Sequence, residues 1–165
     1  MVDFASRTVV LALRIVQFIF AIIVLGLEAY VAHWWNNWHH VSSPSQINFL
    51  IFCSIWTLLA LAYLIVVPWR FADTVAAHKF AILGAEALTM LFWFAGFVAL
   101  AVFLSGRVCF GQVCNCAKAG AAFGAFEWLL FAITTAMAVM HVLRTRDRPA
   151  HNNKADPNVN VAEGV

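Results

Sequence analysis

Charged residues are scarce in this chain: they make up only 11% of its 165 residues, against about 25% in a typical soluble domain. Hydrophobic residues make up 64%, which is more apolar surface than a globule of this size can bury. The polar sequence is too short to build a soluble active site or a second folded domain. The chain also lacks a glycine directly after Met1 and a C-terminal prenylation box, so these lipid anchors are not indicated.

Long apolar segments fill most of the sequence. A helix crosses a bilayer with about 20 apolar residues at a rise of about 1.5 Å each, and every segment reaches that length. Their expected ranges are 8–32, 47–67, 80–104 and 117–142. They predict an all-α membrane protein whose residues 1–148 form one four-transmembrane-helix bundle. The first segment is too long to be a cleaved signal peptide and is interrupted by polar residues, so we expect it to remain as an anchor.

Lysine and arginine are divided unevenly between the two sides of such a bundle. Eight of the ten fall on one side, and only Arg107 and Lys118 fall on the other. Positive charge marks the cytoplasmic side, so both termini and the loop of residues 68–79 are expected there. The loops of residues 33–46 and 105–116 are expected to face outward or into a lumen.

The C-terminal tail changes in composition. Residues 149–165 contain few apolar side chains and are expected to be a disordered cytoplasmic segment. Basic residues near the cytoplasmic surface are each attracted to anionic lipid by about 1 kcal/mol. We therefore expect contact with anionic inner-leaflet lipid from the cluster Arg144, Arg146 and Arg148. The same three arginines also contribute to the excess of positive charge that predicts a cytoplasmic C-terminus.

Polar side chains at membrane depth are costly in lipid and need an explanation. The candidates are Arg14, Gln17, Glu28, Glu86, Lys118 and Glu127. The three in the first segment recur on one stripe of a helix, together with Ala21 and Val24, so that stripe is expected to face the bundle interior.

Depth along the helices suggests two ion pairs. Arg14 and Glu86 each lie about six residues, or roughly 9 Å, past the cytoplasmic end of their segments. Glu28 and Lys118 both lie near the outer boundary. Glu127 has no cation at its level, so it is expected to be protonated or hydrogen-bonded to a neighbouring helix. We interpret these groups as pairing that determines helix order, with an ion or proton path as the alternative.

The last segment carries a second packing signal. Gly120 and Gly124 form a G-x-x-x-G step, and Glu127 continues the same face. Small residues let helix backbones approach closely, which stabilises packing when lipid is the solvent. The partner helix is expected to be the first segment of the same chain, with a second protomer as the alternative.

Three cysteines crowd the second outward loop, at Cys109, Cys114 and Cys116. An outward loop lies in an oxidising compartment, so one disulfide involving Cys109 is expected, with Cys114 or Cys116 as its partner. A zinc site lacks a fourth ligand, and a thioredoxin-like role lacks a C-x-x-C motif. Cys53 is expected to be an inert apolar filler.

Histidines offer weaker signals. His39 and His40 are adjacent on a loop without a nearby cysteine or carboxylate, which favours a solvated loop over a metal site. His78 and His141 could ligate a haem near the cytoplasmic edge, but His33 has no matched histidine at the outer side. No cofactor, metal or nucleic-acid partner is therefore expected.

Two stretches carry a family resemblance: RIVQFIFAIIVLGL at residues 14–27 and CAKAGAAFGAFEWLLF at residues 116–131. Both resemble the first and fourth helices of MARVEL-domain proteins. Over residues 2–148 the chain is most similar to the fungal non-classical export protein family, which includes eisosome-associated membrane proteins. The resemblance implies no catalytic residues. It implies a multi-pass plasma-membrane protein linked to sphingolipid and sterol domains, and it leaves open a homo-oligomer and a cytosolic scaffold as partners.

The leading hypothesis is a non-enzymatic organiser of plasma-membrane lipid domains, with a role in trafficking or lipid signalling. The alternative is a small ion or proton channel or transporter that uses Glu86 and Glu127. Discontinuous helices or internal repeats would favour a transporter, and the sequence shows neither.

Overall fold

The computed structural model describes residues 2–39, 43–70, 79–106 and 111–146. In this part of the chain, four helices follow one another: α1 (Val2–His39), α2 (Ser45–Arg70), α3 (Lys79–Ser105) and α4 (Gln112–Arg146). Each is long and apolar enough to cross a membrane. The all-helical four-span architecture expected from the hydropathy pattern is confirmed.

Every helix is longer than the apolar segment that predicted it, because backbone hydrogen bonding continues past the last lipid-compatible side chain. The difference matters most at α4, which begins at Gln112 and not at residue 117. Cys114 and Cys116 therefore lie in the first turns of a helix, and their expected position in a loop is wrong. Gly111, just before α4, has a φ of 93°, a backbone conformation that favours glycine.

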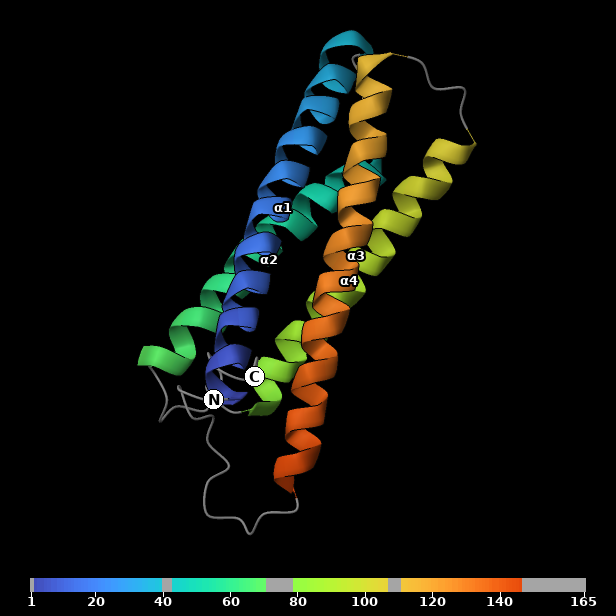
Figure 1. The fold of residues 1–165 in the computed structure, drawn as a ribbon. Coiled ribbons are helices and arrows are strands. Elements are labelled where there is room, and N and C mark those ends of the chain that lie inside the picture. Colours follow the sequence, from blue (N-terminus) through green and yellow to red (C-terminus); the bar gives the residue numbers. More distant parts are fainter. Residues whose placement is uncertain (1, 40–42, 71–78, 107–110, 147–165) are drawn as a thin grey trace.

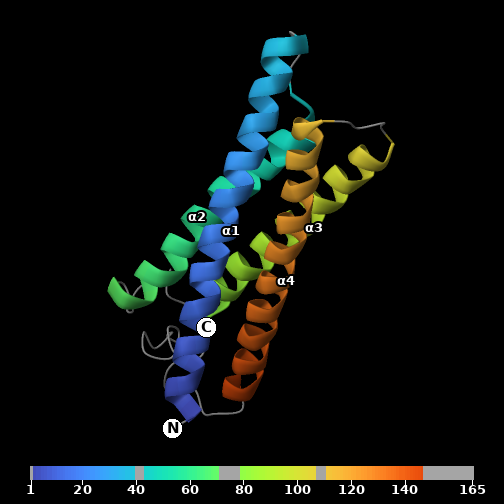
Figure 2. The same ribbon diagram turned by 45° about the horizontal axis from the view of Figure 1, so that its top comes forward.

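The helices run alternately up and down, and each packs against the helices before and after it (Figure 1). The circle closes because α4 also packs against α1, and the two lie side by side in both views (Figure 2). We call the end of the bundle where α1 begins and α4 ends the terminal end, and the opposite one the far end. The orientation of these ends in a membrane stays a prediction.

Buried residues recur at alternating intervals of three and four along the helices, as in left-handed helix packing. On α1 they are Val10, Arg14, Gln17, Ala21, Val24, Glu28 and Val31. On α3 they are Ile82, Glu86, Thr89, Trp93, Gly96 and Leu100. The interior is thus a mixture of apolar side chains and a few polar ones, and the polar ones sit at defined levels.

The exterior is apolar on all four helices, with large side chains such as Ile15, Leu59, Val102 and Leu129 roughly half exposed or more. A soluble protein rarely exposes so much contiguous apolar surface. In a bilayer the same surface faces lipid tails, which are as apolar as leucine. The structure therefore places its polar groups inside and its bulky aliphatic groups outside.

Candidate functional site

The most connected polar cluster lies in the half of the bundle nearer the terminal end. Arg14 on α1 forms an ion pair with Glu86 on α3, and both side chains are buried. Arg14 Nη1 also donates to Gln17 Oε1 at 3.2 Å. The Thr134 hydroxyl on α4 donates to Glu86 Oε2 at 2.7 Å. We call these four residues the ion-pair cluster.

The ion-pair cluster joins three helices, and its central contact runs across the bundle, because α1 and α3 are not sequential neighbours. The two charges cancel, and the second Glu86 oxygen is also satisfied, so neither charge is left alone at membrane depth. A buried pair of this kind specifies an arrangement more than it adds stability, while loss of one partner is strongly destabilising. The ion-pair cluster therefore links α1, α3 and α4 to one another.

A second polar group, Glu28, lies nearer the far end and packs on α4 at Gly120. A Cβ atom built on Gly120 would lie 2.9 Å from Glu28 Cδ and closer still to Oε1. Only a residue without a side chain leaves room for the carboxyl group there. Glu28 is fully buried, and neither of its carboxylate oxygens has a hydrogen-bond partner in the described part of the chain.

The expected ion pair between Glu28 and Lys118 is not formed. Lys118 is exposed, whereas Glu28 is buried against Gly120. Lys118 and Gly120 are two positions apart on α4, which corresponds to roughly 200° of rotation around the helix axis. Lys118 therefore points away from the face that Gly120 presents to α1. The two residues match in depth but not in direction.

Glu127, the third glutamate, lies on α4 beside the backbone of Ala21 on α1. It too is fully buried, and both of its oxygens lack a hydrogen-bond partner among the described residues. Glu28 and Glu127 therefore face the same neighbouring helix pair, α1 and α4, at two different levels.

The two glycines of the G-x-x-x-G step contact different partners. Gly120 receives Glu28 of α1, whereas a Cβ on Gly124 would lie 3.3 Å from Phe97 Cβ and 3.6 Å from the Trp93 ring, both on α3. Both contacts are within the chain. Gly120 thus lets α4 pack closely on α1, and Gly124 lets α4 pack closely on α3.

Sequence reasoning missed two indole–hydroxyl bonds that join α2 and α3. Trp93 Nε1 donates to Thr57 Oγ1 at 2.8 Å, and Trp56 Nε1 donates to Thr89 Oγ1 at 3.0 Å. Each threonine hydroxyl in turn donates to a carbonyl one turn earlier in its own helix. Threonine and tryptophan on otherwise apolar stripes could have indicated such bonds, since hydroxyls commonly link helices in membranes.

Cys53 and Cys116 carry free thiols, whereas Cys114 does not. Cys53 is buried, and its thiol contacts the carbonyl of Phe92 at 3.6 Å. Cys109 lies outside the described residues, so its expected disulfide stays a prediction. Of the two cysteines expected as alternative partners of Cys109, Cys116 has a free thiol.

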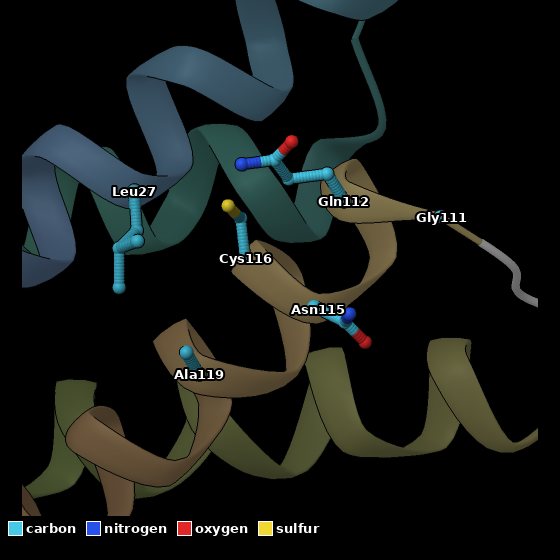
Figure 3. A pocket seen from close by; sticks show the side chains of 6 residues that line it. All are labelled: Leu27, Gly111, Gln112, Asn115, Cys116 and Ala119. Carbon is cyan, nitrogen blue, oxygen red and sulfur yellow. The ribbon is translucent and has the colours of Figure 1, made fainter.

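An open groove lies between α1 and the first turns of α4. It is lined by Leu27, Gly111, Gln112, Asn115, Cys116 and Ala119. Figure 3 shows the Cys116 thiol and the Gln112 side chain directed toward α1. None of the residues that line the groove carries a charged side chain.

Several predicted residues lie outside the described side chains. These are the tail arginines Arg144, Arg146 and Arg148, and the histidines His39, His40, His78 and His141. Their expected roles in lipid contact, and the weaker metal and haem interpretations, stay untested. Among the described residues, no group of three or more His, Cys, Asp or Glu side chains could hold a metal ion.

Comparison with known families agrees with the architecture. The family model of the MARVEL membrane-associating domain matches residues 5–137, which include most of all four helices. No curated protein and no solved structure matches the chain.

Proposed function

This chain belongs to the MARVEL family of membrane-associating domains, and from that premise we propose that it is a non-enzymatic organiser of plasma-membrane lipid domains. The proposal includes the finer resemblance to the fungal non-classical export family and its eisosome-type, sphingolipid- and sterol-linked membrane domains. A role in trafficking or lipid signalling would follow from this gathering activity.

The apolar exterior is the observation that carries the proposal. Large aliphatic and aromatic side chains cover the outside of every helix, so the working surface of the bundle is the surface that lipid touches. The ion pair in the described interior is used to hold helices together, because Glu86 bonds to both Arg14 and Thr134. Lipid contact, and not turnover at a site, is the activity that such a surface supports.

The cluster of three tail arginines supplies the second contact in this proposal. Arg144, Arg146 and Arg148 would bind anionic inner-leaflet lipid, and a cytosolic scaffold or a second copy of the chain could then hold the protein in a patch. The tail arginines can reach the inner leaflet only if the C-terminus is cytoplasmic, as the four-span model with both termini inside predicts. Reporter fusions at Val165 and within residues 42–45 should therefore report opposite sides of the membrane, and identical readings would refute the four-span orientation.

A fluorescent fusion tests the proposed gathering. It should form patches at the plasma membrane that disperse when sphingolipid synthesis is blocked. A variant with all three tail arginines changed to glutamine should show weaker patch retention with unchanged membrane insertion. Uniform fluorescence that is insensitive to sphingolipid and sterol depletion would contradict the proposal.

A small channel or transporter remains the second candidate, because Glu127 is fully buried without a partner among the described residues. Glu86 is less suited to that role, since its charge is balanced by Arg14. In proteoliposomes we expect no ion current or proton flux. A robust flux that Glu127→Gln abolishes would favour the channel over the organiser.

A further inference from the structure

The three buried glutamates are in different environments. Glu86 has a guanidinium and a hydroxyl as partners, whereas Glu28 and Glu127 have no hydrogen-bond partner within the described structure. All three are fully buried. Burial therefore does not distinguish the three carboxyl groups. They differ in whether a counter-charge lies beside them.

Glu28 and Glu127 belong to one interface. Glu28 of α1 packs on Gly120 of α4, and Glu127 of α4 lies beside Ala21 of α1. Gly120 and Glu127 are seven residues apart on α4, so the two carboxyl groups lie roughly 10 Å apart along the helix axis. Together they form a short column of carboxyl groups between α1 and α4.

Among the side chains that the structure describes, no basic residue is paired with Glu28 or Glu127. Arg14 of α1 is bound to Glu86 of α3, and Lys118 of α4 is exposed on another face. His33 of α1 is also exposed, and the described side chains of α2 carry no charge. An ionised carboxylate without a counter-charge is very costly in a medium of low dielectric constant, whereas a neutral carboxylic acid costs far less.

We propose that Glu28 and Glu127 form a proton-binding site at the α1–α4 interface, where each carboxyl group holds its proton as a neutral acid in the membrane interior. The ligand of this site is a proton. Glu86 is excluded from it, because Arg14 and Thr134 already bind its two carboxyl oxygens. This inference does not depend on the proposed role in lipid domains.

Infrared spectroscopy of the full chain in lipid vesicles at neutral pH tests the proposal. A neutral carboxylic acid has a carbonyl band that is separate from the bands of ionised carboxylates. The other side-chain carboxyl groups outside the three buried glutamates are Asp3, Asp73, Asp147, Asp156 and Glu163, in segments expected to reach water, where they should be ionised and silent in that region.

The wild-type protein should show this carbonyl band, and the band should shift when the protein is prepared in deuterium oxide. Glu28→Gln and Glu127→Gln should each remove about half of its intensity, and the double variant should remove it. Glu86→Gln is the matched control and should leave the band unchanged. Absence of the band in the wild-type protein, or its survival in the double variant, would overturn the proposal without requiring any variant to fold as stably as the parent.

Discussion

The carboxyl group of Glu28 on α1 fills the space that a side chain at Gly120 on α4 would occupy. An added Cβ would lie 2.9 Å from Glu28 Cδ, closer than real Cβ atoms approach their neighbours. The glycine is therefore required by a polar contact and not by close approach of the two backbones alone. This relationship links the G-x-x-x-G step to one of the buried carboxyl groups.

Gly120→Ala should destabilise the bundle by about 1–3 kcal/mol, the usual cost of overpacking a tight interface. The added methyl group must displace the buried Glu28 side chain. Thermal unfolding in mild detergent measures the effect. Gly26→Ala is the matched control, because a Cβ there meets nothing within 4 Å. Combining Gly120→Ala with Glu28→Ala should recover part of the loss, and purely additive losses would show that the two residues do not interact.

Arg14→Ala and Glu86→Ala should not be additive. Removing either partner leaves a buried charge alone, which costs about 3–5 kcal/mol where water is excluded. Removing both leaves no charge, so the double variant should be much less destabilised than the sum of the single variants. Arg14 can escape part of the penalty by extending toward the terminal end of the bundle. Strict additivity in detergent unfolding would show that the pair does not couple.

Thr57→Val should destabilise the protein by about 1–3 kcal/mol, because it leaves the buried Trp93 indole N–H without its acceptor. Ser54→Ala is a suitable control. Ser54 is equally buried on the same helix, but its hydroxyl donates only to the carbonyl of Leu50 in its own helix. Equal effects of the two substitutions on the unfolding temperature would count against the inter-helix bond as a stabilising contact.

Cysteine reactivity provides a test of the predicted disulfide. Alkylation under non-reducing conditions, after unfolding, should label Cys53 and Cys116, whose thiols are free. Cys109 and Cys114 should be labelled only after reduction, if the expected bond joins them. Peptide mapping by mass spectrometry distinguishes the sites. Labelling of all four cysteines without reduction would exclude the disulfide.

Much of the architecture could be predicted from the sequence, because lipid imposes a one-dimensional constraint. Uninterrupted apolar length predicts the four spans, and the three–four spacing of Arg14, Gln17 and Glu28 predicts a shared face. Position along a helix also converts directly into depth through a constant rise per residue. That is why Arg14 and Glu86, which match in depth, could be proposed as partners before their contact was seen.

Direction around each helix was decided only by the tertiary structure. Glu28 and Lys118 also match in depth, but packing turns one inward and leaves the other exposed. The same packing divides Gly120 and Gly124 between two partner helices, and it brings Thr57 within hydrogen-bond distance of Trp93. Depth depends on one chain position, whereas a contact depends on the rotation of two helices against each other. That rotation results from packing all four helices at once, which no single segment encodes.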